Sequence, residues 1–163
     1  METPTVAEIS AFVGDNADYY LRKWSRRLDR TGRWSGFNWG AFFLPWPWLA
    51  YRKMYLPAIL AGLSISVYSR TEHMPGVIQD LSLLFGPMFQ LFIMIACGTL
   101  GNDAYLSCTL KTIADVRGQS LGEETKLAEL SKRGGTSVIA CFALPIVCAV
   151  IFFLLARSSG FPY

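Results

Sequence analysis

The stretch FNWGAFFLPWPWLAYRKMY, residues 37–55, holds eight aromatic side chains in nineteen positions. It overlaps eighteen uncharged residues, Trp34 to Tyr51, which approach the length of a membrane span. Pro45 and Pro47 argue against one continuous helix, because an interior proline removes a backbone hydrogen bond and clashes with the preceding turn. In lipid the freed carbonyl groups would lack partners, and tryptophan prefers the membrane interface. The pattern therefore predicts an aromatic interfacial or shallow re-entrant segment over residues 37–51.

Two longer apolar runs indicate a membrane protein. Leu81 to Leu100 is twenty residues without a charge, and Thr136 to Ala156 is twenty-one. Each reaches the roughly twenty residues that a helix needs to cross the hydrocarbon core. The 163-residue chain is 52% hydrophobic and 17% charged, against about 25% charged in soluble domains. Buried helices of a soluble protein are the alternative, but so short a chain has little polar protein to cover two of them.

A third apolar run, Met54 to Ser69, is shorter. Its sixteen uncharged residues would extend only about 24 Å as a helix. The crossing is complete if the helix begins earlier, with Arg52 and Lys53 reaching toward the lipid headgroups. We therefore expect membrane-interface anchors at the end of the aromatic segment: Trp39, Trp46, Trp48, Tyr51, Arg52, Lys53 and Tyr55.

The distribution of basic residues favours three spans and a cytoplasmic N-terminus. With three spans, only Arg70 and Arg157 fall on the outer side. If residues 34–51 also crossed, the basic N-terminal region and the 102–135 loop would lie on opposite faces, against the positive-inside rule. The first twenty residues show no signal-peptide core, so the spans are expected to direct their own insertion. The expected location is a bacterial inner (cytoplasmic) membrane.

The sequence thus predicts an all-α, polytopic helical membrane protein with three spans, an aromatic interfacial or re-entrant segment and cytoplasmic amphipathic helices. The expected parts are cytoplasmic N-terminal helices (1–36), the aromatic segment (37–51), span 1 (52–69), an outer loop (70–80), span 2 (81–101), a cytoplasmic helical loop (102–135), span 3 (136–156) and an outer tail (157–163).

The cytoplasmic parts carry local helix signals. Thr5 and Glu8 fit a capping box, and Ser120 with Glu123 fits a second one. Gly118 is expected to end a helix in the loop, and Thr136 to cap the last span. GDNADYYLRK (14–23) also faintly resembles GNDAYLSCTLK (101–111), which convergent helix starts explain as readily as duplication.

An amphipathic helix is expected after Asn16. Tyr20, Trp24 and Leu28 recur every four residues beside an arginine stripe. The helix either lies on the membrane or packs against another cytoplasmic element. The basic cluster that contains this stripe indicates cytoplasmic retention and attraction to anionic lipid rather than nucleic-acid binding.

The chain resembles a bacterial family named domain of unknown function 2628. The resemblance rests on Asn16 with Tyr19-Tyr20-Leu21, FNW-x-AFF at 37–43, Trp48 and YRKMY at 51–55, and more weakly on Asn-Asp-Ala-Tyr-Leu at 102–106 and GGTS at 134–137. It implies a small inner-membrane protein of several spans. No activity is assigned to the family, so the resemblance supplies no catalytic residues.

The sequence offers little catalytic chemistry. His73 is the only histidine, and no nucleophile, phosphate-binding or metalloprotease motif appears. The four cysteines lack metal-ligand or disulfide-framework spacing. We expect no enzyme activity, no catalytic residues, no cofactor and no metal.

A small-residue face is the remaining feature of the spans. Ala58, Gly62 and Ser66 recur every four residues and would allow close helix packing, within the chain or against a partner. The three apolar runs, 54–69, 81–100 and 136–156, contain no Asp, Glu, Lys, Arg or His, which argues against active transport by a monomer. The leading hypothesis is a non-catalytic accessory or scaffold subunit that contacts membrane lipids and a larger membrane protein complex. The alternative is a small transport or channel component that acts by self-association as a homo-oligomer.

Overall fold

The computed structural model describes residues 3–71 and 76–158, and every regular element in these ranges is a helix. The order is α1 (Val6–Val13), the 3-10 turn η1 (Gly14–Asn16), α2 (Ala17–Leu28), α3 (Trp39–Phe43), α4 (Pro45–Tyr51), α5 (Tyr55–Thr71), α6 (Val77–Arg117), α7 (Glu123–Arg133) and α8 (Val138–Ser158). The all-α fold class is confirmed for the described part of the chain.

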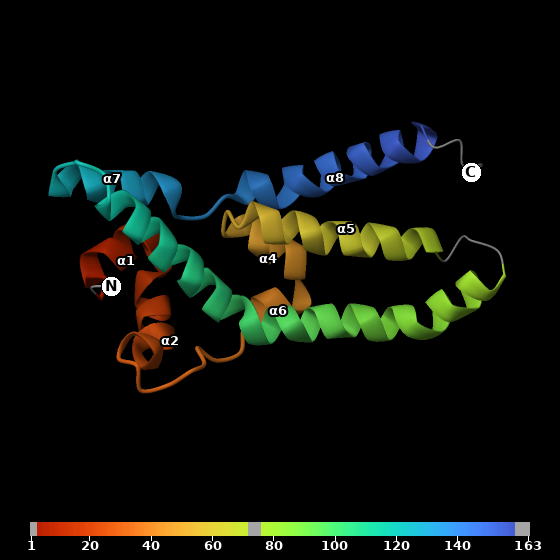
Figure 1. Cartoon of the computed structure of the whole chain (residues 1–163), viewed down its shortest axis with the longest axis horizontal. Helices are drawn as coiled ribbons and strands as arrows, with labels where there is room; N and C mark the ends of the chain where they lie inside the picture. Colours follow the sequence, from red (N-terminus) through yellow and green to blue (C-terminus); the bar gives the residue numbers. More distant parts are fainter. Residues whose placement is uncertain (1–2, 72–75, 159–163) are drawn as a thin grey trace.

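The helices form two zones along the long axis of the molecule. Helix α5, the first half of α6 and α8 run alongside one another in one zone, where α5 contacts both of the others (Figure 1). Helices α1, α2 and α7 gather around the second half of α6 in the other zone, and α4 lies between the two (Figure 1). The two zones therefore share one helix, α6.

Helix α6 is a single helix of 41 residues. At 1.5 Å per residue it is about 60 Å long. The sequence predicted an apolar span over 81–101 and a separate helix after it, but α6 continues through Asn102 without a break. Its C-cap is Gly118, where the sequence predicted the end of a helix. Apolar side chains are exposed along its first half, whereas Tyr105, Ile113 and Val116 in its second half are buried.

Helix α6 is long and apolar enough to cross a membrane. Leu83–Arg117 reaches a mean hydropathy of 1.9 over a window of which only 11% is buried. The core helix of a globular protein would be mostly buried. Among the described residues, α7 and the first part of α8 (Val138–Ile151) pass the same test only as a pair bent by 46°, and Tyr55–Ser64 of α5 is a shorter apolar helix.

The aromatic stretch forms two short helices, α3 of five residues and α4 of seven. The break falls at Leu44, directly before Pro45 at the first position of α4. Proline is tolerated there, because the first N–H groups of a helix have no partner within it. Neither helix is long enough to cross a membrane, in keeping with the broken segment that the prolines predicted.

Helix α2 packs against α6 with its apolar face. Tyr20 and Trp24 are buried, and the ring centroid of Tyr20 lies 5.0 Å from that of Tyr105. Of the two arrangements left open by the sequence, packing against another element of the chain is the one observed for these side chains.

Two predicted caps are wrong and one is confirmed. The Thr5–Glu8 capping box is present at α1. The box at Ser120 and Glu123 does not form, because α7 begins only at Glu123 and its N-cap residue is Gly122. Ser137, not Thr136, caps α8: its Oγ accepts from Ala140 N at 3.1 Å, while its own N–H donates to Tyr51 O at 2.9 Å.

Gly134 and Gly135 join α7 to α1 and α4. Gly135 N donates to Phe12 O at 2.6 Å, and Gly134 lies so close that a Cβ there would stand 2.6 Å from the Phe12 carbonyl carbon. The Lys53 ammonium donates to the carbonyl oxygens of Lys132, at 3.2 Å, and of Gly134. Backbone groups at the end of α7 thus bind two segments that are distant in sequence.

Replacing Gly134 with alanine should separate α1 from α7. The added Cβ overlaps the Phe12 backbone, which cannot move aside as a side chain can, so we expect a loss of about 2–3 kcal/mol in stability. Gly122→Ala is the matched control, because no atom lies within 4 Å of its Cβ position. Denaturant unfolding in lipid nanodiscs measures the free energy of unfolding of both variants. Equal stabilities would contradict the proposed close approach.

Candidate functional site

A network of buried amides fastens the aromatic segment to α6. Asn102 Oδ1 accepts a hydrogen bond from Asn38 Nδ2 at 2.8 Å, and Asn102 Nδ2 donates to Gly36 O at 2.9 Å and to Ser35 O at 3.4 Å. Asn38 Oδ1 accepts from Ala41 N at 2.9 Å and so caps α3. Both amides are buried, where an unpaired polar group would be costly. Asn102 therefore supplies partners to a stretch of backbone that has no regular structure.

The neighbouring Asp103 continues the network outward. Its carboxylate accepts from Ser35 Oγ at 2.7 Å and from Ser35 N at 3.4 Å. It also forms an ion pair with Arg27, with 3.1 Å between Arg27 Nε and Asp103 Oδ1. In addition, Trp24 Nε1 donates to Asn102 O at 3.1 Å. A single turn of α6 thus holds both α2 and the segment that precedes α3.

Two glycines let the aromatic segment approach α6. A Cβ at Gly98 would lie 2.8 Å from Phe37 Cε2, and one at Gly101 would lie 3.1 Å from Ala41 Cβ. Gly98 O also accepts from Asn38 N at 2.7 Å. These glycines serve close packing rather than an unusual backbone conformation.

Arg52 is buried among aromatic rings. Its guanidinium carbon lies 4.7 Å from the ring centroid of Tyr20, 5.2 Å from that of Tyr105 and 5.3 Å from that of Tyr51. The residue is only 7% exposed, and its Nε and Nη1 have no hydrogen-bond partner among the described residues. Burial raises the pKa of Tyr20, although the nearby Arg52 charge opposes the shift. The Tyr20 hydroxyl thus stays neutral, and the cation is held by ring faces.

The other expected anchors differ in exposure. Trp39 and Tyr55 are exposed, with Trp39 65% accessible, whereas Trp46, Trp48 and Tyr51 are partly buried. Lys53 is partly buried at the end of α7. Anchoring in a membrane interface stays a prediction for these six residues.

The small-residue face points toward α8. Ala58 and Gly62 border a cavity of about 140 Å³, together with Trp46 of α4 and residues of α8 from Leu144 to Ala149. Ser66, the third member, has a side chain outside the described part. For the two described members, the neighbours are helices of the same chain.

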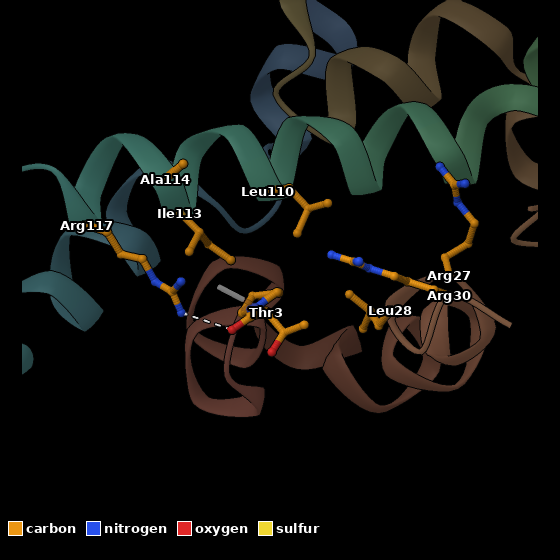
Figure 2. Close-up of a pocket in the computed structure, with 9 residues that line it drawn as sticks. Thr3, Arg27, Leu28, Arg30, Leu110, Ile113, Ala114 and Arg117 are labelled. Carbon is orange, nitrogen blue, oxygen red and sulfur yellow. Dashed lines mark hydrogen bonds between the residues drawn. The ribbon is translucent and has the colours of Figure 1, made fainter. Parts of the chain in front are cut away.

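A larger cavity of about 360 Å³ lies between the N-terminal segment, the end of α2 and the second half of α6. Figure 2 shows its aliphatic side chains, Leu28, Leu110 and Ile113, and its three arginines, Arg27, Arg30 and Arg117. No sequence pattern predicts this cavity, because its walls come from three separate segments.

An ion pair with Glu8 holds Arg117, one of the residues that line this cavity. Arg117 Nε donates to Glu8 Oε1 at 2.6 Å, and Arg117 Nη2 donates to Glu8 Oε2 at 2.7 Å. The Arg117 hydrogen bond, with a smaller contribution from the Thr5 cap, lowers the pKa of Glu8 to about 2 despite the opposing effect of burial. Glu8 is therefore charged at neutral pH.

The described residues hold no cluster of three or more histidine, cysteine or acidic side chains that would bind a metal ion. His73 lies outside the described residues. What the described polar groups form is a structural joint, made of Asn38, Asn102, Asp103 and Arg52, with a cavity beside it. Of these, only Arg52 was singled out from the sequence. The matched segments FNW and Asn-Asp-Ala-Tyr-Leu contained the others.

Comparison with known proteins returns one family. The family described as "Protein of unknown function (DUF2628)" matches residues 9–109. No curated protein and no solved structure matches the chain. The matched region runs from α1 into the second half of α6 and so contains the whole amide network.

Asn102→Leu should weaken the joint between the aromatic segment and α6. The substitution leaves Asn38 Nδ2 and the Gly36 carbonyl without their partner, so we expect a loss of about 2–4 kcal/mol in stability. Asn16→Leu is the control, because Asn16 is exposed and its side chain makes no cap. Denaturant unfolding in nanodiscs, monitored by tryptophan fluorescence, compares the free energies of unfolding of the two variants. Equal losses would refute the structural role of Asn102.

Proposed function

The chain belongs to the family described as protein of unknown function DUF2628, and we propose that it is a non-catalytic accessory or scaffold subunit of a larger membrane protein complex. The observation that carries the proposal is the apolar surface of α5, α8 and the first half of α6. Large apolar side chains on these helices face outward, among them Leu60, Phe92 and Phe142. Monomeric soluble proteins rarely expose contiguous apolar surface on this scale. In the proposed complex, lipid and the helices of a partner protein cover this apolar surface.

We propose three spans, formed by α5, the first half of α6 and α8, in a bacterial inner membrane. Helix α8 has 21 residues and would extend about 32 Å, while α5 has 17 and would extend about 26 Å. Tilt, interfacial side chains and local thinning of the bilayer accommodate a short helix. Helices α1, α2 and α7 then lie in the cytoplasm with the basic residues, as the positive-inside rule favours.

The proposed lack of catalysis rests on the chemistry of the described polar groups. Asn38 and Asn102 bond to each other and to backbone, Asp103 binds Arg27 and Ser35, and Glu8 binds Arg117. A general base or nucleophile needs a site where a substrate can reach it. These groups instead hold segments of the chain together, which suits a protein that presents a fixed surface.

The topology is tested by reporter fusions. A reporter active only in the periplasm should give signal when fused after Tyr163, and one active only in the cytoplasm should not. The same pair fused after Gly118 should give the reverse result, because only two proposed spans precede it. A cytoplasmic signal from the fusion after Tyr163 would overturn the three-span arrangement.

The scaffold role is tested by purification at native expression level in mild detergent, followed by mass spectrometry of intact assemblies. We expect a different membrane protein in fixed stoichiometry with the chain. A tagged membrane protein of unrelated fold and similar size, processed in parallel, identifies adventitious companions. A homo-oligomer of the chain alone would refute the scaffold role and support the transport alternative.

A further inference from the structure

We propose that the cavity between the N-terminal segment, α2 and α6 binds a small organic anion with an apolar body, and that Arg30 is the residue that binds its anionic group. The ligand class follows from the two kinds of wall that the cavity has. At about 360 Å³ it falls at the lower end of the range for small-molecule sites.

One wall is aliphatic. Leu28, Leu110, Ile113 and Ala114 line the cavity from α2 and α6. Ile113 is buried in the core, but Leu110 remains 37% exposed. An apolar group placed here would remove this aliphatic surface from water.

The other wall is cationic, and one of its three charges is unpaired. Arg27 is paired with Asp103, and Arg117 with Glu8. Arg30 is exposed and makes no ion pair or side-chain hydrogen bond within residues 3–71 and 76–158. Among the described residues, no acidic side chain lines the cavity. In Figure 2 the Arg30 guanidinium extends across the cavity toward Thr3, whereas Arg27 turns toward α6. Its planar set of N–H donors matches a carboxylate or phosphate.

The backbone of Arg30 supports a binding role. Residue 30 follows the C-cap of α2, Asp29, and has a φ of 56°. Glycine is the usual residue in this left-handed position, because a Cβ is unfavourable there. Hydrogen bonds from Arg30 N to Arg27 O and from Gly32 N to Arg26 O hold the turn. The chain thus has an arginine at a position where glycine would adopt the same backbone conformation without strain. Strained backbone conformations cluster at functional sites.

The ligand comes from the aqueous phase. In the proposed topology, Leu110 lies nine residues beyond Gly101, about 14 Å farther along α6 from the apolar half. A lipid headgroup in the bilayer would not reach this depth of the cytoplasmic zone. The binding proposal itself does not depend on the scaffold role, since the test below measures neither topology nor partners.

The test uses fluorine NMR on the full chain in phosphatidylcholine nanodiscs. The probe is 4-(trifluoromethyl)benzoate, which has both an anionic group and an apolar body. Its two comparison ligands are 4-(trifluoromethyl)benzyl alcohol, which lacks the charge, and trifluoroacetate, which lacks the apolar ring. Empty nanodiscs correct for partition into lipid. We expect saturable binding of the benzoate that neither comparison ligand matches.

Arg30→Gln should raise the Kd of the benzoate at least about tenfold, the value of one charge-assisted hydrogen bond. Arg33→Gln is the matched control: Arg33 is exposed, as Arg30 is, but it does not line the cavity. This variant removes the same charge and should leave the Kd within about twofold. Equal binding of the benzyl alcohol, or no effect of Arg30→Gln, would overturn the anion site. Equal binding of trifluoroacetate would overturn the apolar part of the site.

Glu2 precedes Thr3 in the chain and lies outside the described residues, so Glu2→Gln completes the set. This variant should bind the benzoate as the natural chain does. If only Glu2→Gln binds the probe, the cavity's occupant is the chain's own carboxylate, and the proposal is wrong.

Discussion

The hydrogen bonds of Asn102 supply partners to the irregular segment that precedes α3. Residues 29–38 form no regular helix, so their backbone groups need partners from elsewhere in the chain. Asn102 stands on a regular helix and has both donors and an acceptor on its side chain. It bonds Asn38 and the carbonyls of Ser35 and Gly36, while its own backbone carbonyl accepts from Trp24. Asn102 thus contacts both α2 and the segment leading into α3, beside the contacts of Asp103 and Tyr105.

Arg52 adds a second constraint at the same joint. A buried cation normally needs a carboxylate, because its desolvation costs several kcal/mol. Here three tyrosine rings surround it instead, and contacts of this kind contribute up to about 2 kcal/mol when desolvated. Nε and Nη1 stay without partners among the described residues. The flat guanidinium can lie over ring faces in a way that an ammonium cannot, so the position favours arginine over lysine.

Some local features were predictable from the sequence, although two local caps were not, and features that depend on distant partners were missed. The Thr5–Glu8 box, the end of a helix at Gly118 and the break at Pro45 follow from neighbouring residues. The continuity of α6 was missed, because the glycine and the first charges after the apolar run resemble a helix boundary. Arg52 was expected to reach toward lipid headgroups. Its burial depends on Tyr20 and Tyr105, which only the folded chain brings together. The cavity has no sequence signature, because Arg30 and Leu110 belong to different helical regions.

One turn of α6 connects the proposed anion site to the aromatic segment. Arg27 lines the cavity and also pairs with Asp103, whose carboxylate accepts from Ser35 just before the aromatic segment. A ligand that drew Arg27 toward the cavity would weaken the first of these contacts and leave the second in place. The ligand can shift the segment only as far as it prefers one position of Arg27 over the other. Asp103 therefore links a residue that lines the cavity to the segment that precedes α3.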